Sequence, residues 1–175
     1  MNRVITIAPV RKSVTVAASQ QVAFETFTER IGSWWPKGHG IGGSGLKDVH
    51  IEPRVGGRVY QVCDDDSEVK WGDVLTWDPH AKFVITWQIT SEWKPSTDAS
   101  AQVHSEVEVR FVPQGPKATR VDLEHRHFER MGAEPGAKMR KDVDGGWPKL
   151  MEMFAAKLGG GSAATAKPIA ETTGS

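Results

Sequence analysis

Several residue types are scarce in this sequence, and each shortage removes a class of protein. A single cysteine, Cys63, stands in 175 residues, which excludes an internal disulfide framework and a zinc site built on several cysteines. Lysine plus arginine and aspartate plus glutamate each number 22, so the formal net charge is zero. A general electrostatic attraction to nucleic acid or to an anionic membrane is therefore not expected, and neither is predicted as a partner.

Long apolar runs are also missing. No stretch approaches the roughly 20 apolar residues of a membrane span, and the N-terminal segment MNRVITIAPV is too short and too polar for a signal peptide. A soluble, cytoplasmic protein is the expectation. The sequence has no phosphate-binding glycine loop, nucleotide fingerprint or Ser-His-acid arrangement, so no cofactor is predicted.

Tryptophan, in contrast, is plentiful. The chain has seven tryptophans but a single tyrosine, Tyr60. A large aromatic ring buries on the order of 150–250 Å², so these rings either fill the core or line an apolar cavity within it.

The composition changes abruptly at Gly159, where GGGSAATAKPIAETTGS begins. This segment is small, polar and free of aromatic residues, which is typical of a disordered tail. The prediction is one folded domain over residues 1–158 and a disordered tail over residues 159–175.

The folded part shows a simple order of elements. A strand in PVRKSVTVAA is followed by a helix across QQVAFETFTER, which Ser19 can cap, and by a second short helix at RIGSWW. Six further strands with short connections are then predicted to be antiparallel, in LKDVHIEP, GGRVYQVC, VKWGDVLTW, KFVITWQI, VHSEVEVRFV and TRVDLEHRHF. An amphipathic helix closes the domain, and Pro148 predicts that it kinks near Trp147 or restarts there.

This α+β layout resembles the helix-grip fold of the START-related, polyketide cyclase and birch-pollen-allergen-like superfamily, called SRPBCC. Within it, the chain is similar to the branch related to the C-terminal domain of the activator of heat-shock chaperone ATPase. The resemblance covers the domain in the stretches VAFETFTERIGSWWP, IEPRVGGRVYQV, WGDVLTWDPHAKFVITW, EVEVRFVPQG, TRVDLEHRHFER and GWPKLMEMF. It implies a curved antiparallel sheet wrapped on a long C-terminal helix, with two short helices after the first strand.

The resemblance also implies a cavity between sheet and helix that binds an apolar small molecule. The candidate lining residues are Phe24, Trp35, Tyr60, Trp71, Trp87, His125, Trp147 and Met151, with Phe154 deeper. The glycine-rich stretch GIGGSG is a candidate lid over the mouth of the cavity. We expect no room for the separate N-terminal domain of the eukaryotic activator, which weakens a chaperone role.

The stretch DLEHRHFER carries acids and histidines that suggest a catalytic or metal site. Alternation along a strand, however, places His125 inward with Val121 and Leu123, and His127 follows if the strand stays regular. Glu124 then faces the other way, so it and His125 do not form an acid–base pair. Two histidines without a third ligand make a poor zinc site, and no metal is predicted.

Asp73 is the other weak catalytic candidate. Regular alternation in VKWGDVLTW places this carboxylate among apolar neighbours, where it would be costly if buried alone. A bulge at Gly72 that turns Asp73 outward is the preferred interpretation, and a general acid or base in the cavity is the alternative. In EPRVGGR, the arginines Arg54 and Arg58 are interpreted as charges beside a glycine turn rather than as a ligand-carboxylate site.

Three functions remain open on these grounds. A small-molecule-binding domain is favoured. The alternatives are a chaperone-cofactor-like interaction module, which predicts an exposed apolar patch on the sheet or at Trp34–Trp35, and a cyclase- or hydrolase-type enzyme using Asp73 or His125. The Trp34–Trp35 segment could serve a homodimer as well as a pocket.

Overall fold

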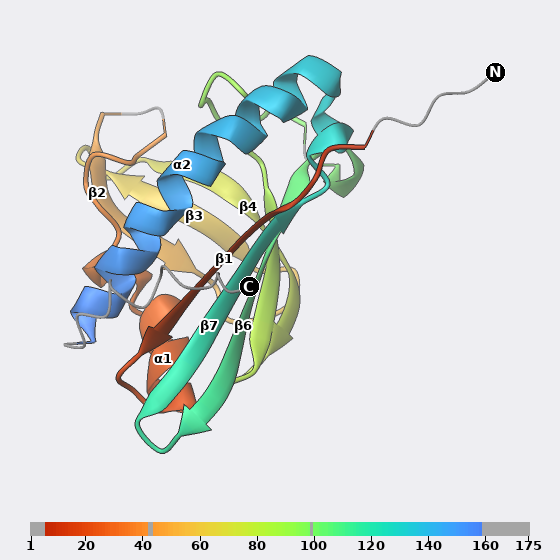
Figure 1. Ribbon diagram of the computed structural model, residues 1–175. Helices are drawn as coiled ribbons and strands as arrows, with labels where there is room; N and C mark the ends of the chain where they lie inside the picture. The colour runs from red at the N-terminus through yellow and green to blue at the C-terminus, as the bar shows by residue number, and fades with distance from the viewer. Residues whose placement is uncertain (1–5, 42–43, 99, 159–175) are drawn as a thin grey trace.

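A computed structural model describes residues 6–41, 44–98 and 100–158 (Figure 1). The predicted tail over residues 159–175 and two glycines of the predicted lid, Gly42 and Gly43, lie outside these described residues. The elements follow in the order β1 (Val10–Val16), α1 (Gln20–Phe27), η1 (Ile31–Ser33), β2 (Leu46–Ile51), β3 (Arg58–Cys63), β4 (Glu68–Asp78), β5 (Lys82–Trp87), η2 (Ala101–Val103), β6 (Ser105–Gly115), β7 (Ala118–Arg126), η3 (Phe128–Met131) and α2 (Ala133–Lys157).

The seven strands form one sheet in the order β1-β7-β6-β5-β4-β3-β2, and every neighbouring pair is antiparallel. Only β1 pairs out of sequence, because it joins the far edge beside β7. The sheet is curved, and the long helix α2 lies across its concave face, as Figure 1 shows in blue. The predicted helix-grip fold, with two short helices after the first strand, is confirmed.

The first helix is set by its cap and its apolar stripe. Ser19 accepts a hydrogen bond from the backbone N–H of Val22 at 3.2 Å, as its N-cap position predicts. Phe24 and Phe27 lie on the buried face of α1 and close one end of the interior against the sheet.

Helix α2 runs without a break from Ala133 to Lys157 and contains Pro148. The predicted restart near Trp147 is therefore wrong. A proline removes one backbone hydrogen bond from a helix, and burial of the stripe on either side of Pro148 compensates for that loss. The buried positions of this stripe include Met139, Val143, Trp147, Leu150, Met151 and Phe154.

Two irregularities in β4 decide which of its side chains face inward. Its register with β3 shifts between the pairs Val59–Gly72 and Tyr60–Lys70, and its register with β5 shifts near Leu75. Such bulges reverse the alternation of faces along a strand. A Cβ added at Gly72 would lie 1.9 Å from the backbone oxygen of Thr86, so only glycine fits where β4 approaches β5 this closely.

Candidate functional site

A pocket of about 360 Å³ lies between the sheet and α2. Its volume falls within the range of about 300–1,000 Å³ typical of small-molecule sites. The residues that line it are mostly apolar, and five of them are tryptophans: Trp35, Gly38, His39, Gly40, Ile41, Trp71, Trp87, Ile89, Trp93, Asp142, Val143, Gly146, Trp147 and Leu150.

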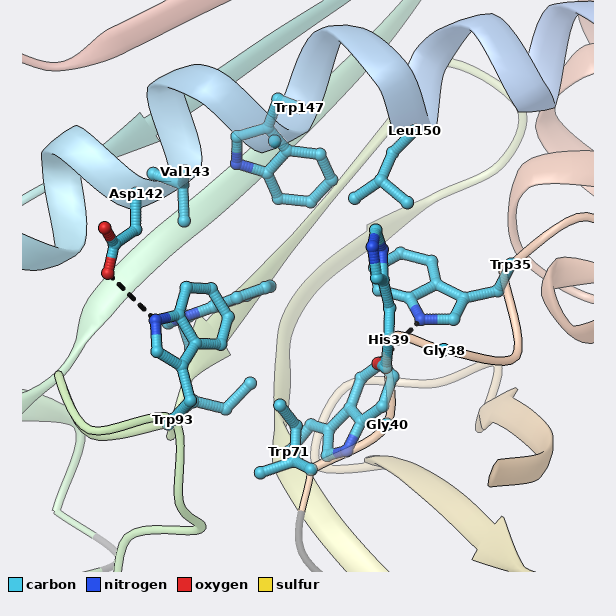
Figure 2. Close-up of a pocket in the computed structure, with 14 residues that line it drawn as sticks. Trp35, Gly38, His39, Gly40, Trp71, Trp93, Asp142, Val143, Trp147 and Leu150 are labelled. Carbon is cyan, nitrogen blue, oxygen red and sulfur yellow. Dashed lines mark hydrogen bonds between the residues drawn. The ribbon is translucent and has the colours of Figure 1, made fainter. Parts of the chain in front are cut away.

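Four parts of the chain meet at this pocket. Figure 2 shows Val143, Trp147 and Leu150 pointing down from α2, with Trp71 opposite them on the sheet side. The loop that carries Trp35 and His39 forms one side, and the loop that carries Trp93 forms the other. Residues distant in the sequence thus converge on one volume, which no single motif could reveal.

Gly146 contributes space to the pocket. It lies on α2 one residue before Trp147, and a Cβ added to it would meet no atom within 4 Å. The neighbouring Gly145 also has open space around its Cβ position but lies on the exposed side of the helix. The pocket is therefore partly a consequence of a missing side chain.

Four of the five lining indoles are held by hydrogen bonds from their own N–H groups. Trp35 donates to the backbone oxygen of His39, Trp71 donates to Gln61, Trp93 donates to Asp142, and Trp147 donates to His125, at 3.2, 3.0, 2.9 and 3.1 Å respectively. An indole anchored through its polar edge cannot move freely to fill a neighbouring void. These bonds keep the walls of the pocket apart.

Trp87, at the end of β5, is the exception. Its side chain is 5% exposed, and its indole N–H is buried with no hydrogen-bond partner among the residues that the structure describes. Its ring packs against those of Trp93, His125 and Trp147, with centroid distances of 6.2, 5.0 and 5.6 Å. A buried N–H without an acceptor is rare in folded proteins.

Gln61 organises the wall on the β3 side, and sequence reasoning missed it. Its side chain is fully buried, and its Oε1 accepts hydrogen bonds from the Ile41 backbone N–H at 2.7 Å and from Trp71 Nε1 at 3.0 Å. Its Nε2 donates to Cys63 Sγ at 3.2 Å. Gln61 lies between Val59 and Cys63 on the inner face of β3, but alternation alone does not identify that face, because Val62 is apolar on the other one.

Two titratable side chains reach the pocket rim, His39 and Asp142. His39 is exposed on its loop. Asp142 accepts hydrogen bonds from Lys138 Nζ and from Trp93 Nε1, which hold the pKa of its carboxyl below the ordinary value of 3.8. Asp142 is therefore ionised at neutral pH, and its interactions make it an anchor for the Trp93 loop rather than a proton donor.

Of the eight candidate lining residues, the structure brings four to the pocket: Trp35, Trp71, Trp87 and Trp147. Phe24 lies in the solid core among Trp77, Phe83 and Phe111, and neither it nor Met151 is a lining residue. Tyr60 lies on the outer side of β3, where the Arg58 guanidinium stacks 4.1 Å above its ring. Phe154, expected deeper, packs against Phe27 and Trp34.

His125 faces inward as alternation predicts, but a layer of tryptophan separates it from the pocket. Its Nδ1 accepts from Trp147 Nε1, which leaves the proton on Nε2, 2.8 Å from Ser105 Oγ. Complete burial lowers the pKa of His125 to about 3, so the ring is neutral. Both nitrogens are engaged within the protein, and His125 positions Trp147 rather than lining the site.

His127 does not follow His125 inward. Strand β7 ends at Arg126, and His127 adopts a left-handed backbone conformation with φ of 66° on the surface near Glu129. The two histidines therefore do not share a face. The expectation that they could is wrong because the strand ends one residue too early.

Asp73 lies on the outer side of the sheet, as the bulge interpretation predicted. Its carboxylate pairs with Lys70 at 2.8 Å and accepts from Gln88 Nε2 at 2.6 Å. It is not a lining residue of the pocket, so the geometry does not support a catalytic role there.

Two other predicted features are structural. Trp34 and Trp35 are 4% and 8% exposed, so the exposed apolar patch expected at that turn by the interaction hypothesis is absent there. Arg54 and Arg58 pair with Glu52, and Arg58 also pairs with Glu68. These ion pairs lie beside the turn between β2 and β3, as the structural interpretation of that segment predicted. Among the described residues, no helix is long and apolar enough to cross a lipid bilayer.

Several known structures resemble the chain over most of its length. One described as an anthrahydroquino-gamma-pyrone synthase, Txn09, complexed with SUM, is 39% identical, with a TM-score of 0.61, over 86% of this chain and 97% of that one. The self-sacrificing resistance protein CalC from Micromonospora echinospora is 32% identical, with a TM-score of 0.59, over 86% and 93%.

A third structure, DynU16, described as a putative protein in the dynemicin biosynthetic locus, is 16% identical with a TM-score of 0.58, over 90% of this chain and 49% of that one. At this identity the likeness concerns the fold alone. No curated protein matches the chain.

The sequence profile described as "Activator of Hsp90 ATPase homolog 1-like protein" matches residues 17–159, which include every strand after β1 and both α-helices. The helix-grip architecture and the two solved structures above 30% identity agree with this match. The chain therefore belongs to the family of Activator of Hsp90 ATPase homolog 1-like proteins, within the SRPBCC superfamily.

Proposed function

We propose that this protein binds a small, apolar, aromatic molecule in the pocket between the sheet and α2. The observation that carries the proposal is the pocket itself, about 360 Å³ in volume and lined by five tryptophans. Aromatic rings attract other aromatic rings through offset and edge-to-face contacts. Burial of an apolar ligand here gains roughly 25 cal/mol per Å² of apolar surface removed from water.

The relatives support a ligand with fused rings. The structure described as an anthrahydroquino-gamma-pyrone synthase is 39% identical to this chain and is covered over 97% of its length. We infer that the ligand here belongs to the same broad class of polycyclic aromatic molecules.

The first experiment is native mass spectrometry of the purified protein, in which a co-purified small molecule is the expected result. The second is calorimetric titration with fluorene, a flat apolar probe. Gly146→Leu places a side chain into the pocket and is expected to weaken fluorene binding about tenfold or more, a loss of at least 1.4 kcal/mol.

Gly145→Leu provides the matched control. It makes the same change one residue earlier on the same helix, but on the exposed side. Equal fluorene affinity in both variants, or no fluorene binding by the unaltered protein, would argue against the pocket as the binding site.

Catalysis in the same pocket is the second candidate, and the identity to a synthase favours it. The titratable side chains at the pocket are His39 and Asp142, since Asp73 and His125 are not lining residues, and the ionised Asp142 is suited only to the role of a base. Incubation with a polycyclic polyketide precursor, followed by mass spectrometry, tests this function. Turnover that survives both His39→Ala and Asp142→Asn would exclude these two residues as its acid–base groups.

Stimulation of a chaperone ATPase is the alternative that the family description suggests. It is tested by adding the protein in equimolar amount to an Hsp90-type chaperone and measuring ATP hydrolysis. An unchanged hydrolysis rate would remove this alternative.

A further inference from the structure

The polar side chains at the pocket differ in whether the protein already uses them. Asp142 is bound by Lys138 and Trp93, and four of the five lining indoles donate their N–H to acceptors of the protein. The fifth N–H, that of Trp87, is buried. His39 lines the same pocket, and within the part of the chain that the structure describes its imidazole has no hydrogen-bond or ion-pair partner.

The backbone of His39, in contrast, is held in place. Its N–H donates to the Pro36 oxygen at 3.0 Å, and its carbonyl oxygen accepts from Trp35 Nε1 at 3.2 Å. Two residues later, the Ile41 N–H donates to the buried Gln61 at 2.7 Å. Figure 2 shows the His39 side chain extending from this loop towards α2. The protein thus positions the imidazole at the pocket and leaves its ring nitrogens available to another molecule.

His39 lies at the mouth of the pocket. The lining residues with exposed or half-exposed surface are Gly38, His39, Gly40, Trp93, Asp142 and Gly146. The other lining residues are buried tryptophans and aliphatic side chains. A ligand that fills the pocket therefore has its ring frame inside and its polar substituent at the mouth, where His39 is the side chain with an unused polar atom.

We propose that His39 is a specificity-determining residue of this pocket, and that its imidazole binds the hydroxyl group of a phenol-type aromatic ligand. This inference rests on the proposed function, because it names the polar group that the bound molecule carries. A neutral imidazole has one nitrogen that donates and one that accepts, and a phenolic hydroxyl is both a donor and an acceptor. The hydroxyl donates to the unprotonated ring nitrogen, so the contact forms with either tautomer of the histidine.

The charges at the mouth favour a neutral hydroxyl over a carboxylate. Among the described lining residues there is no lysine or arginine. The hydrogen bond from Lys138 holds the pKa of Asp142 below the ordinary value of 3.8, so Asp142 is negatively charged at neutral pH and disfavours a second anion nearby. A phenol is neutral, and it enters an apolar pocket without the cost of desolvating a charge.

The test compares two ligands that differ in one group. Fluorene and 2-hydroxyfluorene share the same flat tricyclic frame, and the second carries the hydroxyl. Their affinity ratio is measured by calorimetry at about pH 8, where histidine side chains are ordinarily neutral. The unaltered protein is compared with His39→Phe, which keeps a ring but removes both nitrogens. We expect the ratio of hydroxyfluorene to fluorene affinity to fall about three- to tenfold, the value of one net hydrogen bond.

His50→Phe is the matched control. It makes the same substitution at a half-exposed histidine that packs against Tyr60 on the outer side of the sheet and does not line the pocket. The affinity ratio should not change in this variant. An equal fall in both variants would contradict a direct contact between His39 and the hydroxyl.

Two outcomes separate this inference from the proposed function. An unchanged ratio in His39→Phe, with both ligands still bound, would overturn the role of His39 and leave the proposed function intact. Failure of the unaltered protein to bind either ligand would refute the proposed function, and the His39 inference with it.

A second measurement uses the unaltered protein and so does not depend on how a variant folds. Long-range nitrogen-15 spectra report the ring nitrogens of the six histidines, before and after each ligand is added. An upfield shift of one unprotonated imidazole nitrogen with hydroxyfluorene and not with fluorene is the expected result. The same response to both ligands would contradict a hydrogen bond to the hydroxyl.

Discussion

The two ends of the interior differ in their main aromatic residues and in how closely these pack. The end beneath α1 is filled by phenylalanines in edge-to-face and tilted contact, with centroid distances of 4.9–6.3 Å: Phe24, Phe27, Phe83, Phe111 and Phe154. The other end, beneath the middle of α2, is lined by tryptophans and encloses about 360 Å³. One interior thus contains a packed core and a cavity side by side.

At the tryptophan end, hydrogen bonds from the indole edges restrain rings that border the cavity, whereas Trp34, whose N–H donates to the Thr26 oxygen at 2.9 Å, packs closely against Phe27 and Phe154. A phenyl ring has no polar group that needs a hydrogen-bond partner, so its position is determined by close packing alone. An indole is restrained by its N–H, as in the bonds from Trp71 to Gln61 and from Trp147 to His125. Four such restrained rings border the cavity.

The largest expected effect is a loss of stability on mutation of the phenylalanine end. Phe24→Ala removes a ring that contacts Trp77, Phe83 and Phe111, and Phe24 is 1% exposed. We expect the free energy of unfolding to fall by about 3–5 kcal/mol, the usual cost of a Phe→Ala cavity. Urea denaturation measures the loss, and fluorene affinity under native conditions should be unchanged. A loss below about 1 kcal/mol would mean that this end is not close-packed.

The next prediction concerns the hydrogen bonds that hold the indole N–H groups at the tryptophan end. Gln61→Leu removes the acceptor shared by Trp71 Nε1 and the Ile41 N–H. Two buried donors then lose their partner, so we expect about 1–3 kcal/mol of destabilisation, together with weaker fluorene binding because the Trp71 wall is released. Urea denaturation and calorimetry measure these two quantities.

Gln88→Leu is the control for that change. Gln88 is also buried, but its amide bonds to Asp73 and Thr86 rather than to a pocket residue. It should cost stability without changing fluorene affinity. If both variants weaken fluorene binding equally, the hydrogen bond between Gln61 and Trp71 does not shape the pocket.

A third prediction concerns the effect of acid on the buried His125, which lies behind Trp147. The pKa of His125 is lowered by burial from 6.5 to about 3 in the folded protein. Between these values the unfolded chain binds a proton that the folded chain does not, so stability is full above pH 6.5 and falls as the pH drops towards about 3. The expected slope approaches about 1.4 kcal/mol per pH unit at most.

The contribution of His125 is measured most directly between pH 6.5 and 5. Asp142, whose pKa is lowered by its hydrogen bond from Lys138, loses its contribution only below its ordinary value of 3.8. His125→Gln keeps a polar side chain that does not titrate, and urea denaturation at several pH values should show a flatter dependence. An equal slope in both proteins would assign the acid sensitivity to another group.

The sequence alone was sufficient for the fold and for part of the site. Alternation along the strands and the stripe of α2 predicted the sheet and the long helix, because burial dictates both patterns. Alternation placed Trp87 on the inner face of β5, and the stripe of α2 placed Trp147 on the face that meets the sheet. Alternation did not identify the inner face of β3, because Val59 and Val62 are both apolar and lie on opposite faces of that strand.

Depth and loop geometry were beyond reach from the sequence. His125 faces inward as predicted. Trp147, which is distant in the sequence, lies between His125 and the cavity, and this tertiary contact could not be predicted from the strand pattern. Trp93 reaches the pocket from a loop, where its own φ is 61°. A residue in such a loop follows no helical or strand periodicity, so the sequence pattern could not place it. Gln61 was missed because a buried glutamine is informative only once its two donors are located.

The smallest expected effect concerns the outer face of the sheet, which serves as the reference for both interior ends. Asp73→Asn removes the charge that pairs with Lys70, a contact whose carboxylate side chain is 28% exposed. Partly exposed ion pairs of this kind contribute about 0–1 kcal/mol, so the loss should lie in that range. Fluorene affinity, and the turnover of any substrate that is found, should stay unchanged, because Asp73 and the pocket lie on opposite sides of the sheet. A loss of turnover in Asp73→Asn would return this carboxylate to the list of catalytic residues and contradict the bulge that turns it outward.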